Sequence, residues 1–129
     1  MENGECRMEN ARMRENAIGE KSMLFAVRIV KLYRHLLRNK SEHVLAKQVL
    51  RSGTSIGANV REAGSAQSKA DFTSKMSIAL KECGETLYWL ELLVRTESIS
   101  QKEYASIGGD CGELFALLTA IVKTSRRER

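Results

Sequence analysis

Proline is absent from this 129-residue chain, and aromatic residues make up only 5% of it. These absences exclude collagen-like chains, proline-rich linkers and aromatic-rich β folds. No apolar run approaches the roughly 20 residues that a helix needs to cross a bilayer. The N-terminus also lacks the apolar segment of a secretory signal. We therefore expect a soluble, cytoplasmic protein that makes no contact with a membrane.

Cysteine is scarce as well. Cys6, Cys83 and Cys111 are odd in number, far apart and without CxxC spacing, which argues against a disulfide framework or a zinc site. Cys83 and Cys111 fall at apolar positions of helical patterns, so we expect them to be buried free thiols. The Glu-x-x-His pairs that form di-iron sites in helical bundles do not occur. We expect no metal and no other cofactor.

What the chain does contain is a series of amphipathic helices. Apolar residues recur at spacings of three and four over about residues 21–38, 42–66, 68–95 and 100–126. Residues 1–20 lack this period, and we expect a flexible or loosely helical tail there, ahead of one helical domain over residues 21–126. Short polar connections between the four helices predict an all-α, antiparallel up-down-up-down four-helix bundle.

Several local features refine this picture. Ser68 with Asp71, and Ser100 with Glu103, have the spacing of a capping box at a helix start. Two glycines, at positions 53 and 57, lie within the second helix, where each costs roughly 1 kcal/mol relative to alanine. Because the apolar period continues in phase, we expect an unbroken helix whose glycines allow a neighbouring backbone to approach. In an antiparallel hairpin, Cys83 and Cys111 should lie at one level of the core.

The segment from Gly53 to Gly57 also matches the G-x-S-x-G motif of hydrolases, with Ser55 as the nucleophile. That motif needs a strand before the serine, whereas both flanks here are helical. Hydrolase order also places a histidine after the serine, and both His35 and His43 come before it. We therefore expect a protein that is not an enzyme, with no catalytic residues.

A polar stripe accompanies the apolar face of the second helix. It consists of Gln48, Ser52, Ser55, Asn59 and Glu62. Small polar residues at these positions favour hydrogen bonds across a helix–helix or subunit interface, and a binding groove is the alternative.

Apolar residues exceed one stripe per helix. A second stripe on the first helix and a patch of Trp89, Leu92 and Leu93 on the third predict subunit contacts, the alternative being one broad monomer core.

The positive charge is concentrated in one part of the chain. Residues 22–66 carry eight positive and two negative side chains, whereas the whole chain has a net charge of +5. A local basic surface favours polyanions such as RNA or DNA, and a solvated basic face is the alternative. The candidate phosphate contacts, all on the first two helices, are Arg28, Lys31, Arg38, Lys47, Arg51 and Arg61.

Two stretches resemble the signature of a bacterial protein family. They are Arg51-x-x-x-Ser55-Ile56-x-x-Asn59-Val60-x-Glu62 and Ala79-Leu80-Lys81-Glu82-Cys83-Gly84-Glu85-Thr86-Leu87-Tyr88-Trp89-Leu90. The family is named for proteins encoded in intervening sequences of 23S ribosomal RNA genes. It also includes the accessory variability determinant of diversity-generating retroelements, and the resemblance covers about residues 21–122.

This resemblance implies a four-helix bundle that assembles into a ring-like homopentamer and binds nucleic acid through basic surfaces. It makes a reverse transcriptase a candidate protein partner. The residues that it marks as family motif or interface are Arg51, Ser55, Ile56, Asn59, Glu62, Trp89 and Leu93. Our expectation is a non-enzymatic oligomeric binding or scaffold protein that contacts RNA or DNA. The alternative is a protein–protein adaptor with no nucleic-acid role.

Overall fold

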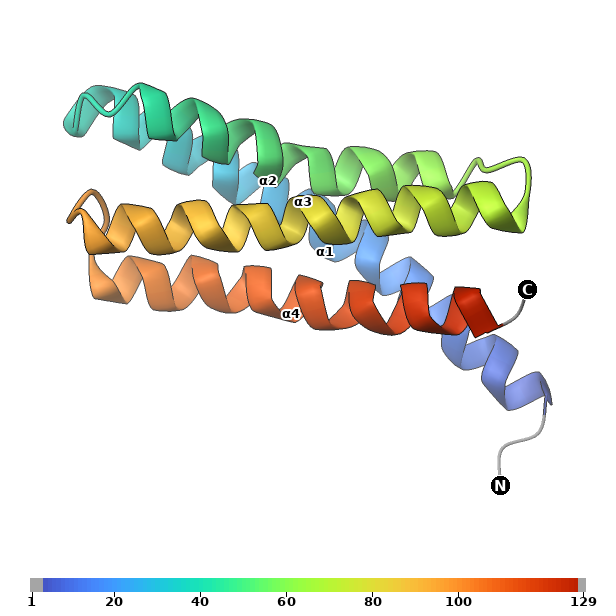
Figure 1. Cartoon of the computed structure of the whole chain (residues 1–129). Coiled ribbons are helices and arrows are strands. Elements are labelled where there is room, and N and C mark those ends of the chain that lie inside the picture. Colours follow the sequence, from blue (N-terminus) through green and yellow to red (C-terminus); the bar gives the residue numbers. More distant parts are fainter. Residues whose placement is uncertain (1–3, 128–129) are drawn as a thin grey trace.

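The structure is a computed structural model that describes the backbone of residues 4–127 and the side chains of residues 9–127. Within these residues the chain forms four helices and no strand: α1 (Gly4–Asn39), α2 (Val44–Ala63), α3 (Lys69–Arg95) and α4 (Gln101–Arg127). The predicted all-α four-helix bundle is confirmed (Figure 1). The side chain of Cys6 and residues 1–3 of the expected tail lie outside the described residues.

Each helix packs antiparallel to its neighbours in sequence, as Figure 1 shows. The order of side-chain contacts gives the same result for α1 and α4, because Arg14 meets Thr124 and Arg28 meets Asp110. The ion pairs between α2 and α3 give the same result. Arg51 pairs with Glu85, whereas Glu62, later in α2, pairs with Lys75, earlier in α3. Over the described residues, neither diagonal pair, α1 with α3 or α2 with α4, brings its backbones close together. The four helices therefore form a square in which each one touches two others.

The first helix is longer than the sequence pattern predicted. It begins at Gly4 instead of about Lys21, so the domain boundary expected near residue 20 falls inside a continuous helix. Glu, Arg, Met and Ala are frequent in this segment and favour helix even without an apolar period. Ile18 is completely buried and anchors the segment to the bundle. In Figure 1 the N-terminal half of α1 diverges from α2 and projects past the end of α4.

Two glycines set the close packing of α1 against α2. A Cβ atom built on Gly53 would lie 2.8 Å from Cγ1 of the fully buried Ile29. A Cβ atom built on Gly57 would lie 3.4 Å from the backbone oxygen of Ser22. Helix α2 is nevertheless unbroken, so both expectations for these glycines are confirmed. The cost of glycine in a helix is offset here by the close contact with α1.

The predicted helix caps and the predicted level of the two core cysteines are also confirmed. Ser68 accepts a hydrogen bond from the Asp71 amide. Ser100 and Glu103 form a reciprocal capping box at the start of α4. Both cysteines are free and buried, and the Sγ atoms of Cys83 and Cys111 lie 3.8 Å apart between α3 and α4. The hydrogen bond with Cys83, and secondly burial, raise the pKa of the Cys111 thiol far above its usual range.

Helix α4 differs from the expectation in one respect. By length and composition alone it is apolar enough to cross a membrane, whereas the sequence pattern predicted no such helix. A single helix of this kind is weak evidence, because the core helix of a bundle passes the same test. Here the apolar side of α4, including Ile107, Leu114 and Leu118, is buried within the bundle.

Candidate nucleic-acid interface

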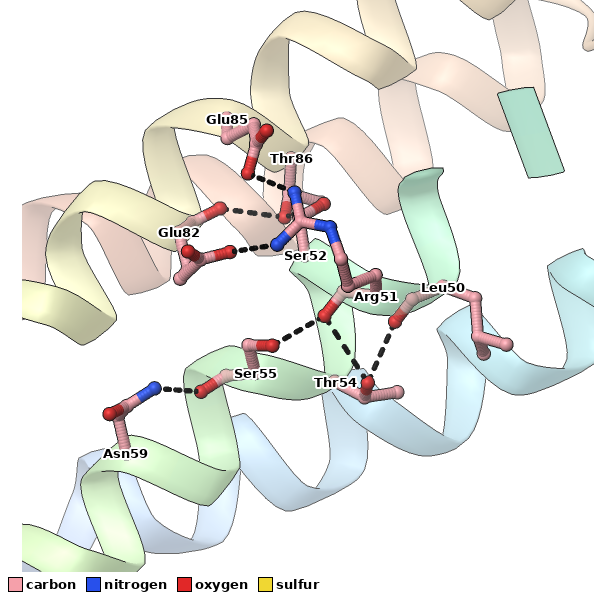
Figure 2. A network of polar contacts seen from close by, with 9 residues as sticks. All are labelled: Leu50, Arg51, Ser52, Thr54, Ser55, Asn59, Glu82, Glu85 and Thr86. Atoms are coloured by element: carbon pink, nitrogen blue, oxygen red, sulfur yellow. Dashed lines mark hydrogen bonds and ion pairs between the residues drawn. The ribbon is translucent and has the colours of Figure 1, made fainter. Parts of the chain in front are cut away.

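Arg51 occupies the centre of a polar network between α2 and α3 (Figure 2). Its guanidinium donates to Glu82 Oε2 at 3.2 Å and to Glu85 Oε2 at 2.5 Å. The hydrogen bond from Arg51 lowers the pKa of the Glu85 carboxyl, and the same contact raises the pKa of Arg51. Two carboxylates therefore balance this cation. Arg51 joins two helices of one chain, which does not favour the phosphate contact predicted for it.

The polar stripe of α2 is engaged in hydrogen bonds within the bundle. The buried hydroxyl of Ser52 lies 2.9 Å from that of Thr86 on α3. Ser55 donates to the backbone oxygen of Arg51, and Asn59 donates to that of Ser55 (Figure 2). Ser55 thus lies in an unbroken helix instead of on the strained turn of a nucleophile elbow. These contacts agree with the structural interpretation of the stripe.

The two remaining polar members of the stripe lie nearer its ends. Gln48 is half-buried, and the exposed Glu62 pairs with Lys75 of α3 at 3.5 Å. Ile56, between them, is a fully buried core residue. This part of the family signature therefore holds α2 in place within one chain.

The predicted patch on α3 is only partly at the surface. Leu93 is completely buried, because it packs inside the bundle instead of facing a second subunit, so its assignment as an interface residue is corrected. Trp89 is half-buried, and its indole nitrogen is buried without a hydrogen-bond partner of normal geometry. The indole nevertheless contributes to lowering the pKa of Glu85. The exposed aromatic residue is its neighbour Tyr88, which stacks edge-on against Trp89.

The six predicted phosphate contacts do not form one surface. Like Arg51, Arg28 is engaged within the chain, because it donates to Asp110 at 2.6 Å and to Ser106 at 2.9 Å on α4. Arg61 is exposed near the C-terminal end of α2. It lies about 21 Å along the helix from Lys47, so the two cannot share one phosphate group.

The structure brings together a smaller group of cations without described partners, at the end of the bundle that is opposite to Arg61. Lys31, Arg34 and Arg38 are exposed on the outer face of α1, and none of them pairs with a described carboxylate. We call these three residues the α1 basic stripe. Lys31 also borders a shallow groove of about 520 Å³ between α1 and α4, together with Lys102. Exposed Lys40 follows in the connection to α2.

The acidic residue in this groove is already engaged. Glu103 accepts the backbone N–H of Ser100 at 2.9 Å in the capping box. That bond is the main cause of the lowered pKa of Glu103, and His35 and Lys40 lower it further by their charge. The effect of Lys40 shows that the charge in the connection after α1 reaches the start of α4. The groove is therefore positive despite this carboxylate.

Sequence reasoning missed Arg34, Lys40 and Lys102 as candidate contacts. Arg34 could have been found, because it lies three residues after Lys31 and four before Arg38, on the same helical face. Lys102 could not, because only the folded bundle places it beside α1. His35, between Arg34 and Arg38 in the sequence, is half-buried, and its Nδ1 lies 2.7 Å from Nδ2 of Asn39.

Comparison with known proteins assigns the chain to a family. The profile of the family described as "23S rRNA-intervening sequence protein" matches residues 14–120. A crystal structure of a protein with unknown function from the S23 ribosomal protein family of Bacteroides thetaiotaomicron is 56% identical, with a TM-score of 0.84. The match covers 85% of this chain and 98% of that chain. No curated protein matches the sequence. The chain therefore belongs to the 23S rRNA-intervening sequence protein family.

Proposed function

We propose that this protein is a non-enzymatic, oligomeric binding protein that contacts the phosphates of RNA or DNA through the α1 basic stripe. The observation that carries the proposal is the difference between paired and unpaired cations. Arg28 and Arg51 are held by carboxylates of the same chain, whereas Lys31, Arg34 and Arg38 are exposed and pair with no carboxylate of the described residues. Cations without a partner can neutralise phosphates at no cost in broken ion pairs.

The geometry of the stripe suits a phosphate backbone. Its three residues span about 10 Å along one face of a rigid helix. The exposed aromatic side chains, Tyr88 and Phe115, belong to α3 and α4, so no aromatic residue of the stripe is available to stack on a base. We therefore expect weak sequence specificity and strong dependence on salt. The names of the family and of the similar crystal structure both refer to the ribosome, which makes RNA the first ligand to test.

The test is a titration of labelled RNA, single-stranded and duplex, at two salt concentrations. The variant replaces Lys31, Arg34 and Arg38 with glutamine. The matched control replaces Lys81, Lys123 and Arg126, which are exposed on α3 and α4, so both variants lose the same charge. We expect binding to weaken only in the first variant, with the salt slope falling by about 2 to 3. Equal weakening in both variants, or an affinity insensitive to salt, would refute the proposed surface.

The absence of catalysis is part of the proposal. The serine of the G-x-S-x-G match donates its hydroxyl hydrogen to a backbone oxygen of the same helix. Neither histidine contacts it, since His35 bonds to Asn39 and His43 precedes α2 at the end of the bundle. A hydroxyl in this position has no base to activate it. Hydrolysis of an ester substrate that is lost on Ser55→Ala substitution would contradict this part of the proposal.

The oligomeric state rests on apolar side chains that one chain leaves exposed. Met23, Leu24 and Val27 are exposed on α1, next to the α1 basic stripe. Leu24 and Val27 border a mostly apolar groove of about 410 Å³ between α1 and α4. Clusters of this kind mark contact surfaces. We propose that a second copy of the chain covers this face, in the homopentamer that the family resemblance implies.

The second candidate function is a protein–protein adaptor, such as a partner of a reverse transcriptase. The observation that favours it is the exposed Tyr88, whose ring lies edge-on against the half-buried Trp89. An exposed tyrosine, with an apolar ring and a polar hydroxyl, is typical of protein interfaces. An adaptor would keep its function when the α1 basic stripe is replaced and would lose it in the Tyr88→Ala variant.

A further inference from the structure

A cavity lies at the end of the bundle where α4 ends (Figure 1). Its volume is about 360 Å³, which is within the range of small-molecule sites. All four helices contribute to it: the N-terminal half of α1, the end of α2, the first turn of α3 and the last turns of α4. The divergence of α1 from α2 opens this space, at the opposite end from the α1 basic stripe.

Arg14 is the group that gives this cavity its chemistry. The side chain is partly buried, and its Nη2 donates to Thr124 Oγ1 at 3.2 Å. Its Nε is fully buried and has no hydrogen-bond partner among the described residues. No described carboxylate pairs with this guanidinium. A guanidinium has five N–H donors in a fixed planar fork, and a buried donor without an acceptor is costly, so this position favours an anion.

The rest of the lining defines the ligand more closely. Phe72, Ile121 and Ala63 supply an apolar wall, and Lys69 in the first turn of α3 also borders the cavity. The positive end of the α3 dipole points to the same space, although Asp71 offsets part of its field. Glu15 also borders the cavity and is exposed. The lining therefore has Arg14 on one side and apolar side chains on the other.

We propose that this cavity binds a small organic anion, with its carboxylate or phosphate on Arg14 and its apolar part against Phe72 and Ile121. Arginine binds both groups through parallel N–H donors of its planar guanidinium, and Arg14 lines the cavity with no described carboxylate paired to it. The proposal is independent of nucleic-acid binding, because the cavity and the α1 basic stripe lie at opposite ends of the bundle. It assigns a ligand class to a site that is separate from the candidate nucleic-acid interface.

The experiment follows the Nε–Hε resonance of Arg14 in the 15N-labelled full chain. Loss of one Nε–Hε signal in the Arg14→Lys variant identifies it. Phenyl phosphate is then titrated at constant ionic strength, with benzoate and the neutral phenol in parallel. We expect both anions to shift the Arg14 signal saturably, with one ligand bound per chain. Phenol should leave the signal in place, because it lacks the charge that Arg14 recognises.

Variants separate this site from general attraction to a basic protein. Arg14→Gln keeps a polar side chain of similar length and should weaken phenyl phosphate binding by roughly tenfold or more, measured by calorimetry. Arg12→Gln removes an equal charge from an exposed position of the same helix and should leave the affinity unchanged. Equal loss in both variants, or a shift of the Arg14 signal that never saturates, would overturn the proposal. The titration of the unsubstituted protein decides the question even if Arg14→Gln fails to fold.

Discussion

At position 53 the lack of a side chain determines how closely two helices approach. We predict that Gly53→Ala destabilises the protein, although alanine is favoured over glycine in a helix by roughly 1 kcal/mol. The new Cβ would lie 2.8 and 2.9 Å from two side-chain atoms of Ile29, which is buried and stiff about χ1. Overpacking of this kind costs about 1 to 3 kcal/mol. Urea denaturation followed by circular dichroism measures the change.

The matched control for this prediction is Gly19→Ala. Gly19 lies in α1, and a Cβ atom built on it meets nothing within 4 Å. The helix preference of alanine should therefore appear without a clash, as a gain of about 0.5 to 1 kcal/mol. If both substitutions stabilised the protein, the contact between Gly53 and Ile29 would not be what limits the separation of α1 and α2.

The two core cysteines give a second prediction for single residues. Cys83 and Cys111 are buried, and the pKa of Cys111 is raised by its hydrogen bond with Cys83 and by burial. Because this pKa is raised, the thiolate fraction of Cys111 at neutral pH is very small, and only the thiolate reacts readily. In a Cys6→Ser background, we expect Ellman's reagent to leave both thiols unmodified in the native protein and to modify both in denaturant. Rapid modification of the native protein would show that α3 and α4 separate readily at this level.

Among the helices, the start of α4 links stability to pH. Hydrogen bonds from Ser100 lower the pKa of Glu103 in the folded state, because they stabilise its charged form. A lowered pKa means that the stabilisation is complete above the unfolded value of about 4.3 and is lost as the pH falls through the folded value. Glu103→Gln should thus cost about 0.3 to 1 kcal/mol at pH 7 and progressively less below about pH 4.

The control for this prediction is Glu20→Gln, measured over the same pH range. Glu20 is exposed on α1, and no described residue pairs with it. Its substitution should change the free energy of unfolding little at any pH. A cost of Glu103→Gln that stayed constant from pH 7 to pH 3 would show that packing, instead of the charge in the capping box, is responsible.

The helices also show which features a sequence can predict. Both helix caps and the continuity of α2 were predicted, because each depends on residues within a few positions of one another. The start of α1 was not, because one buried residue, Ile18, produces no period. The partners of Arg28 and Arg51 lie 82 and at least 31 positions away in sequence, so their ion pairs depend on how the helices pack. The candidate interface could therefore be predicted only as a basic region and not as particular residues.

At the level of the whole molecule, folding reduces the positive surface that the sequence indicates. The basic excess lies in residues 22–66, on α1 and α2. The bundle places carboxylates of α3 and α4 against it, so that Asp110 holds Arg28 while Glu82 and Glu85 hold Arg51. What remains for a polyanion is the outer face of α1. That same helix also carries the exposed Met23, Leu24 and Val27, so the assembly and the ligand binding that we propose would use neighbouring parts of one face.

This arrangement makes a prediction about the assembled protein. Replacing Leu24 with glutamate and Val27 with lysine keeps the net charge but removes two apolar side chains that are 58% and 45% exposed. Because the hydrophobic contribution of this face would be lost, we expect light scattering after size exclusion to show a lower mass for this variant than for the unsubstituted oligomer. Tyr88→Glu, on α3, should leave the mass unchanged. Dissociation by Tyr88→Glu alone would move the subunit contact to α3, and a monomeric unsubstituted protein would refute the assembly itself.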